Sequence, residues 1–252
     1  LSSISRQPAY YATRHRSLSK SARMRKFLHA MMNRARRRLR WQSVRFEFWR
    51  TFRGKRVCLI GNAAAIDGLR LGQAIDACDI VVRFNVALVE QREATVGTKT
   101  DVRFVGVTLN ERWRGPFEEV PAADPLWTFD KNAAYLRTLR RPFVAIPDKW
   151  QMLALSFFKR RHPEVIVGPI PAKPPRSGVV FLLLVLLYGR PRGVVLYGFT
   201  RHETEAYQAI YRANERRQED LERYAQAHCE PSVEIAILQK LKDLNMITFG
   251  SA

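Results

Sequence analysis

Short apolar segments recur along this chain, and they are separated by segments with helical character. Alternation of this kind favours an α/β fold: a single Rossmann-like, mostly parallel sheet flanked by helices. Strands are predicted over 56–60, 79–84, 101–107, 125–129, 143–146, 193–197 and 246–249. Helices are predicted over 69–77, 149–161, 178–188, 203–227 and 232–244. The helix over 178–188 is apolar nearly all round, which predicts burial against the sheet.

Charge divides the chain into two parts. The formal net charge is +20, and Glu47 is the only acid before Val57. We therefore predict a basic extension over 1–53 and an α/β domain over 54–252. Apolar residues such as Phe27 and Met31 lie among the extension's arginines, as in an amphipathic helix that binds an anionic membrane surface. A solvated basic arm, an organellar transit peptide and a nucleic-acid-binding arm have similar compositions.

Several common functions lack their motifs here. Gly61-Asn62 follows the first predicted strand, as a nucleotide-binding turn would, but alanines follow instead of the glycines of GxGxxG, which disfavours a dinucleotide-dependent oxidoreductase. No Walker lysine motif occurs. The five histidines are scattered, so no metal cofactor is expected. The longest apolar run, 179–188, is too short to cross a bilayer.

The segment from Arg56 to Thr100 carries the most specific pattern. A Val-Cys-Leu-Ile-Gly-Asn run at 57–62 is followed by glycine, Ile-Asp, Asp, Arg, Asn and Ala at set offsets, and the segment closes with Val-Gly-Thr-Lys-Thr at 96–100. The intervening residues are Gly72, Ile75, Asp76, Asp79, Arg83, Asn85 and Ala87. This segment resembles the large motif of the eukaryote-type sialyltransferases, glycosyltransferase family 29.

Two later segments extend the resemblance. Pro175, Ser177-Gly178 and a strand ending in Tyr-Gly-Phe at 197–199 are similar to the family's small motif. His228 and Glu234, followed by leucines, resemble its distal motif, although the family usually has one residue fewer between the His and the Glu. The family's His-Tyr-Tyr motif has no clean counterpart, and His202, next to Glu203, is the candidate for its place.

The resemblance implies a variant GT-A-like fold and inverting transfer of sialic acid from a CMP-activated donor to a glycan or glycolipid, as in cell-surface polysaccharide synthesis. The single phosphate of CMP could be bound by a helix N-terminus without a metal. His228 would be the general base, with His202 as a second catalytic candidate. Donor contacts are expected from Gly61, Asn62, Asn85, Ser177, Gly178 and Glu234. Asp76, Asp79 and Arg83 are expected to form ion pairs.

Cysteine positions predict the compartment. The family's large-motif cysteine aligns with Val57, and its small-motif partner falls at about Pro191. Cys58 lies one position away and would lack that partner. Because both disulfide cysteines are missing, we expect a reducing compartment and a cytosolic enzyme, such as a bacterial one, held peripherally on the inner face of the cytoplasmic membrane.

Two alternatives stay open. Because the motifs recognise CMP better than the sugar, the donor could carry Kdo or another nonulosonate. A different class of function is a basic nucleic-acid-binding protein, in which the extension would track phosphates. No RNA- or DNA-binding motif is recognised in the chain.

Overall fold

The computed structural model describes residues 20–61, 66, 69–85, 89–109, 117–199 and 227–250. By its internal contacts the chain separates into two units, residues 1–42 and 43–252. The division lies before the boundary at 53/54 predicted from charge. The reason is that Val44, Phe48 and Phe52 recur every four residues on helix α1 (Lys20–Phe52) and are buried in the second unit.

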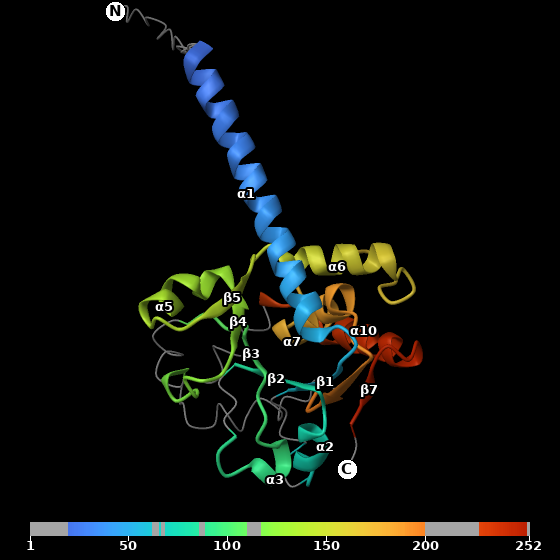
Figure 1. The fold of residues 1–252 in the computed structure, drawn as a ribbon. Coiled ribbons are helices and arrows are strands. Elements are labelled where there is room, and N and C mark those ends of the chain that lie inside the picture. Colours follow the sequence, from blue (N-terminus) through green and yellow to red (C-terminus); the bar gives the residue numbers. More distant parts are fainter. Residues whose placement is uncertain are drawn as a thin grey trace, which may run out of the picture. The chain divides into compact units, whose positions relative to one another are not determined.

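Seven parallel strands form one sheet in the order β5-β4-β3-β2-β1-β6-β7, which confirms the predicted α/β fold. The chain moves outward from β1 to β5 and then returns to β6 on the other side of β1, so the strand order reverses between β1 and β6 (Figure 1). The strands are β1 (Arg56–Ile60), β2 (Ile80–Phe84), β3 (Val102–Val105), β4 (Leu126–Phe129), β5 (Phe143–Ile146), β6 (Gly193–Tyr197) and β7 (Thr248–Phe249).

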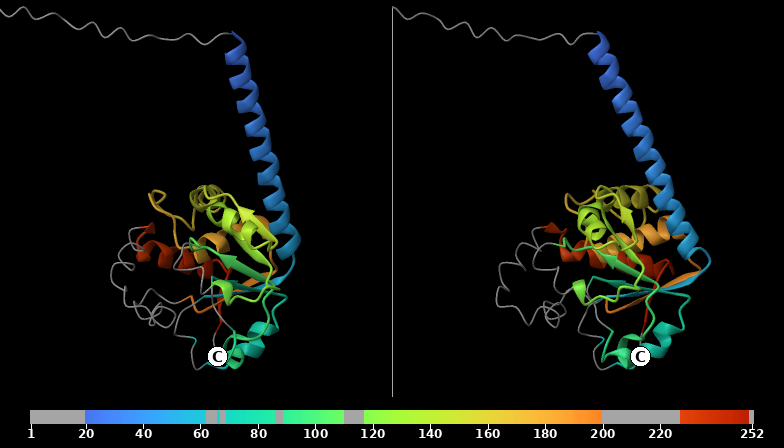
Figure 2. Two further views of the ribbon diagram at one scale, coloured as in Figure 1. Left: turned by 90° about the vertical axis from the view of Figure 1, so that its left-hand side faces the viewer. Right: turned by 60° about the vertical axis from the view of Figure 1, so that its left-hand side comes forward.

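Helices cover both faces of the sheet. Helices α6 (Trp150–Arg161) and α7 (Ser177–Leu184) lie on one face, and the short helices α2 (Gly72–Asp76) and α3 (Glu93–Val96) lie on the other (Figures 1 and 2). Other described helical segments are α5 (Ala133–Thr138), which precedes α6, a π-helical turn that extends α7 over Val185–Gly189, and α10 (Pro231–Asp243). The helix predicted over 203–227 falls almost entirely outside the described residues. None of the described helices is long and apolar enough to cross a membrane.

Aromatic side chains fill the layer between the sheet and α7. The ring of Phe181 on α7 lies 4.5 Å from that of Phe104 on β3 and 5.5 Å from that of Phe48 on α1, centroid to centroid. Trp127 on β4 contacts Phe48 edge-on at 4.9 Å. All four side chains are almost fully buried. Burial of this much aromatic surface fixes α7, and therefore its first residue, against the sheet.

The opposite face combines apolar clusters with two buried arginines. Arg83 on β2 and Arg103 on β3 occupy paired positions, and each side chain is only 1% exposed. Arg83 donates to the carbonyl oxygens of Val96, Gly97 and Lys99 and to the Thr100 hydroxyl. Burial lowers the pKa of Arg83 to about 10, so its guanidinium stays charged at neutral pH. Arg83 therefore ties the segment before β3 to the sheet.

Candidate functional site

The turns after four strands meet at one edge of the sheet. Gly61 follows β1, Asn85 follows β2, Gly106 follows β3 and Gly198 follows β6. Because all the strands are parallel, these residues lie at the carboxyl edge, and β1 and β6 flank the point where the strand order reverses. Open α/β sheets bind ligands at such a switch point.

Gly61 and Gly198 pack backbone against backbone. The N–H of Gly61 donates to the carbonyl of Tyr197 over 2.7 Å, and a Cβ on Gly61 would overlap the carbonyl oxygen of Gly198. Gly198 has a φ of +66°, which favours glycine. The ring of Phe199 lies beside both Gly61 and Gly178, and a Cβ on Gly178 would lie 3.1 Å from it. Only small residues allow this close approach of the two turns.

Asn85 organises the neighbouring turn from a left-handed conformation, with φ of 56°. Its side-chain Oδ1 accepts hydrogen bonds from the backbone N–H groups of Gly106 at 2.9 Å and Val107 at 3.2 Å. The ligand-binding role predicted for its amide therefore falls to Nδ2, because Oδ1 is engaged. Asn85 shapes the segment after β3 in addition to any contact with a ligand.

Ser177 and Gly178 begin α7 at the same edge. A Cβ on Gly106 would overlap the side chain of Ser177, so the turn after β3 and the start of α7 touch. Ser177 and Gly178 are partly exposed. The first N–H groups of a helix have no partner within the helix, and together with the helix dipole they favour an anion. The sequence-predicted residues Gly61, Asn85, Ser177 and Gly178 thus lie on three adjoining turns.

Asn132 holds the segment after β3 through buried hydrogen bonds. Its Oδ1 accepts from the N–H of Leu109 at 2.9 Å, and its Nδ2 donates to the carbonyl of Val107 at 2.7 Å and to the Thr128 hydroxyl at 2.9 Å. Thr128 in turn donates to the carbonyl of Val105 at 2.7 Å. Asn132 and Thr128 are buried. A fully bonded polar network of this kind rigidifies the segment after β3.

Glu234 belongs to α10, but its side chain contacts the residue just before α7, 58 positions earlier in the chain. Its side chain is 2% exposed, and Oε1 accepts a hydrogen bond of 2.5 Å from the N–H of Arg176. Its other oxygen lies 3.8 Å from the Arg176 guanidinium. The carboxylate therefore accepts the hydrogen bond of the Arg176 N–H, directly before Ser177, and links α10 to α7. The donor contact predicted for Glu234 stays a prediction.

His228 lies against the same loop. The N–H of the next residue, Cys229, donates to the carbonyl of Pro174 at 3.0 Å. Burial lowers the pKa of His228 below its ordinary value of 6.5, and this effect outweighs the opposing influence of Glu234 and of the Pro175 carbonyl. The imidazole is therefore mainly neutral at pH 7, as a general base requires. Burial also raises the pKa of the Cys229 thiol to about 11, which leaves it protonated.

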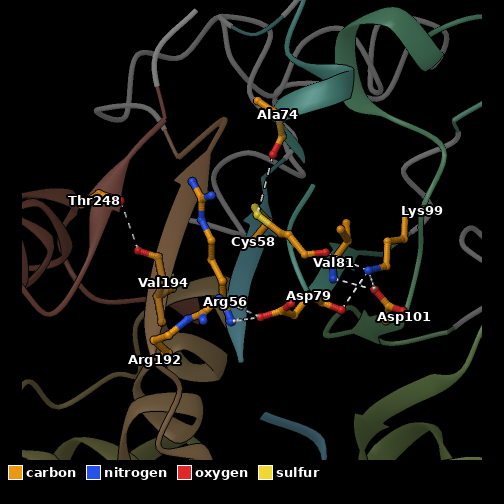
Figure 3. The surroundings of a disulfide bond; sticks show 11 residues. Arg56, Cys58, Ala74, Asp79, Val81, Lys99, Asp101, Arg192, Val194 and Thr248 are labelled. Carbon is orange, nitrogen blue, oxygen red and sulfur yellow. Dashed lines mark hydrogen bonds and ion pairs between the residues drawn. A yellow bond between two sulfur atoms is a disulfide. The ribbon is translucent and has the colours of Figure 1, made fainter. Parts of the chain in front are cut away.

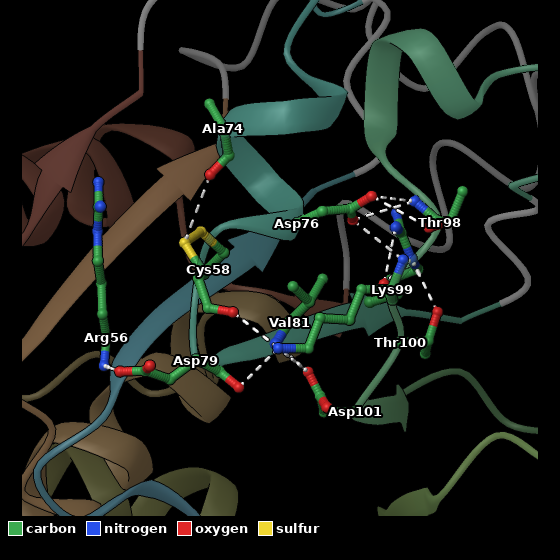
Figure 4. Close-up of polar contacts among 12 residues, drawn as sticks. Arg56, Cys58, Ala74, Asp76, Asp79, Val81, Thr98, Lys99, Thr100 and Asp101 are labelled. Atoms are coloured by element: carbon green, nitrogen blue, oxygen red, sulfur yellow. Dashed lines mark hydrogen bonds and ion pairs between the residues drawn. A yellow bond between two sulfur atoms is a disulfide. The ribbon is translucent and has the colours of Figure 1, made fainter.

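The predicted ion pairs of the large motif take a different form. Asp76 accepts from the backbone N–H groups of Thr98 and Lys99 and from the Thr98 hydroxyl (Figure 4). Asp79 accepts from the N–H of Arg56 at 2.7 Å and pairs with Arg192 at 3.3 Å. These carboxylates fix the loops that precede strands β3 and β1, at the amino edge, away from the candidate site.

Cys58 is bonded to Cys78, which corrects the expectation that it would lack a partner (Figure 3). Cys58 lies on β1, and Cys78 is the second residue after the end of α2. Both residues belong to the apolar cluster between the sheet and α2. Sequence reasoning considered only the pairing typical of the family. It missed this one because proximity across the strand–helix–strand turn is a property of the fold.

Two predicted site residues, Asn62 and His202, lie outside the described residues. Within the described parts of the chain, no three His, Cys, Asp or Glu side chains gather as a metal site would require. The absence of a metal requirement stays a prediction.

Sequence reasoning missed Gly106 and Asn132. The signal for Gly106 was present, because strands β1, β3 and β6 each end in a hydrophobic residue followed directly by glycine, at Gly61, Gly106 and Gly198. Nothing in the local sequence marks Asn132, whose partners are contributed by segments up to 27 residues away.

The chain is similar to known sialyltransferases in part of its sequence and in its fold. The family model "Glycosyltransferase family 29 (sialyltransferase)" matches residues 7–124, which include the whole large motif. The mouse α-N-acetylgalactosaminide α-2,6-sialyltransferase 2 is 47% identical over 55 residues, which is 22% of this chain and 14% of the mouse protein. The rat lactosylceramide α-2,3-sialyltransferase is 43% identical over 49 residues, 19% of this chain and 13% of the rat protein.

Solved structures give wider coverage. A mammalian sialyltransferase in complex with Gal-β-1-3GalNAc-ortho-nitrophenol aligns with a TM-score of 0.55 at 18% identity, over 78% of this chain and 69% of the other. A second mammalian sialyltransferase structure aligns with a TM-score of 0.53 at 16% identity, over 83% and 78%. At this identity the likeness shows a common fold. The matched segments span only a small part of the curated relatives' length.

Proposed function

We propose that this chain, whose residues 7–124 match the family 29 model, is a glycosyltransferase that transfers a sialic acid, or a related nonulosonate, from a CMP-activated donor to a hydroxyl group. The observation that carries the proposal is the meeting of Gly61, Asn85 and Ser177 at one sheet edge, with His228 against the loop that leads into Ser177.

The start of α7 suits the phosphate of CMP. Glu234 uses the N–H of Arg176, so the N–H groups of Ser177 and Gly178 are the next donors in the first turn. They can stabilise the negative charge that develops on the phosphate as its bond to the sugar breaks. The Ser177 hydroxyl, the Asn85 Nδ2 and Asn62 would add hydrogen bonds to phosphate or ribose. In this scheme Glu234 holds the helix start and does not contact the donor.

His228 would supply the base. The oxygen of the acceptor hydroxyl attacks the anomeric carbon, CMP leaves with the electrons of the broken carbon–oxygen bond, and the hydroxyl proton passes to the neutral imidazole. A single displacement of this kind inverts the anomeric centre. The lowered pKa of His228 keeps the base available at neutral pH. His202 stays a second catalytic candidate, and no metal is required by these steps.

The acceptor class follows from the relatives. The similar proteins are named for acceptors that are N-acetylgalactosaminides and lactosylceramide. We propose a glycan or glycolipid acceptor for this chain.

For the location, we propose a cytoplasmic enzyme associated with the inner face of the membrane. The missing family cysteines at Val57 and about Pro191 support the cytoplasm, whereas the Cys58–Cys78 disulfide favours an oxidising compartment. Thiol content therefore tests the location.

Calorimetric titration with CMP and CDP tests donor binding. Turnover of CMP-sialic acid and CMP-Kdo by wild type and by His228→Ala then tests the reaction and the base. His162→Ala is a matched control, because His162 lies at the end of α6 and pairs with Glu164. We expect CMP binding in all three proteins and a large loss of turnover only in His228→Ala. A chain that binds no CMP and transfers from neither donor contradicts the proposal, and turnover of CMP-Kdo alone would reassign the sugar.

A further inference from the structure

The described part of the first unit, residues 20–42 of helix α1, carries an unusual surface. Six large apolar side chains are between 50% and 66% exposed. They are Met24, Phe27, Leu28, Met31, Met32 and Leu39. At about 100° per residue they fall within an arc of about 140° on one side of the helix. We call this arc the apolar face.

Basic residues surround the apolar face. Arg25 and Arg36 border one side and Arg34 the other, while Lys26, Arg37 and Arg40 lie on the opposite side of the helix. Arg38 falls inside the arc, nearly two turns beyond Met32, where its long side chain can extend toward a polar layer. Residues 20–42 contain no acid. The surface therefore pairs apolar and cationic character along the same length of helix.

We propose that the apolar face enters the headgroup region of an anionic phospholipid membrane, with the flanking arginines binding lipid phosphates. This inference refines the membrane association included in the proposed function and does not depend on the sugar transferred. An anionic bilayer is complementary to both components, because its acyl boundary accepts Leu, Met and Phe while its surface charge attracts Arg and Lys.

Other binding partners match only one of the two properties of this helix, its apolar face or its positive charge. A second copy of this helix would bring two strongly cationic segments together with no acid to pair them. RNA would bind the arginines through its phosphates and could stack on an aromatic ring, but it offers no environment for Leu28, Met31 and Met32. The apolar and basic sides together thus favour lipid.

Vesicle flotation with the full chain tests the proposal. Vesicles of phosphatidylglycerol mixed with phosphatidylcholine are compared with phosphatidylcholine alone, at low and high salt. The test variant is Leu28→Gln with Met31→Gln, which removes apolar area without changing charge. The matched control is Ala30→Gln with Asn33→Gln, which places the same residue on the opposite side of the helix. Circular dichroism verifies equal helicity.

We expect wild type and control to bind the anionic vesicles in a salt-sensitive way, and the test variant to bind roughly tenfold or more weakly. Equal binding by the test variant and wild type overturns the insertion of the apolar face. Dimerisation that the test variant abolishes, or RNA binding with no vesicle binding, also overturns it. CMP affinity should be the same in every variant, so failure of the proposed reaction would be recognised separately.

Discussion

Glu234 on α10 accepts a 2.5 Å hydrogen bond from the backbone N–H of Arg176, although the two residues are 58 positions apart. The bond joins the distal part of the chain to the start of α7, where Ser177 and Gly178 lie. Glu234, which is only 2% exposed, therefore has the Arg176 N–H and the Arg176 guanidinium among its partners.

Replacing Glu234 tests this role. Glu234→Ala removes the acceptor and leaves the Arg176 N–H without it, so we expect a loss of about 1–3 kcal/mol in the free energy of unfolding. Glu234→Gln keeps an oxygen that can accept the bond and should recover part of that loss. Urea denaturation measures both variants. If Glu234→Ala is as stable as wild type and loses only CMP affinity, Glu234 is a ligand residue instead.

Substitutions at Asn85 can distinguish its role in positioning the segment after β3 from a role in binding the ligand. Asn85→Ala loses both bonds to the segment after β3 and places alanine at a positive φ, so stability should fall by about 1–3 kcal/mol. Asn85→Asp keeps the accepting oxygen, but it replaces the Nδ2 donor with a second carboxylate oxygen and adds a negative charge. We expect Asn85→Asp to unfold near the wild-type midpoint while binding CMP more weakly. Unchanged CMP affinity in this variant would exclude Nδ2 from the donor site.

The close approach of Gly106 to Ser177 predicts an effect on catalysis. A methyl group at position 106 must displace the Ser177 side chain, and a shift of this size should lower kcat/KM by about tenfold or more. Gly193→Ala is the matched control, since a Cβ on Gly193 meets nothing within 4 Å. Steady-state kinetics with CMP-sialic acid compare the two. Equal effects would indicate general damage to the sheet.

The lowered pKa of His228 predicts a pH profile. As a general base the imidazole must be neutral, so activity should fall as pH decreases, with the acid limb of kcat/KM below pH 6.5. The same sign holds for stability: because the folded-state pKa is lower than the unfolded one, stability is lost as pH falls below 6.5. An acid limb centred above pH 6.5 contradicts this environment for His228.

Thiol titration tests the disulfide. With Cys58 bonded to Cys78, the denatured protein should expose one thiol, Cys229, without reductant and three after reduction. Closing a loop of 20 residues contributes about 3 kcal/mol to stability, so Cys58→Ser with Cys78→Ser should lower the unfolding midpoint. Three thiols in protein purified under non-reducing conditions would contradict the disulfide and support the cytoplasmic location proposed above.

The sequence predicted most of the fold because apolar periodicity is a local signal. All seven strands were located from runs such as those ending at Ile60 and Tyr197, and the parallel sheet followed from their alternation with helices. Gly61, Asn85 and Ser177 were found through motifs. The side-chain partners were not predictable, since the bonds of Asn132 and Glu234 and the disulfide of Cys58 depend on segments that only the folded sheet brings together.

The two edges of the parallel sheet carry different kinds of contact. At the amino edge, Asp76, Asp79 and Lys99 bind backbone groups of the chain itself. At the carboxyl edge lie the glycine turns after β1, β3 and β6 and the first turn of α7. Sequence drift can therefore reshape substrate preference in the carboxyl-edge turns while the amino-edge contacts preserve the architecture. For protein engineering, grafted loops that alter acceptor choice belong at the carboxyl edge, and stabilising substitutions belong at the amino edge.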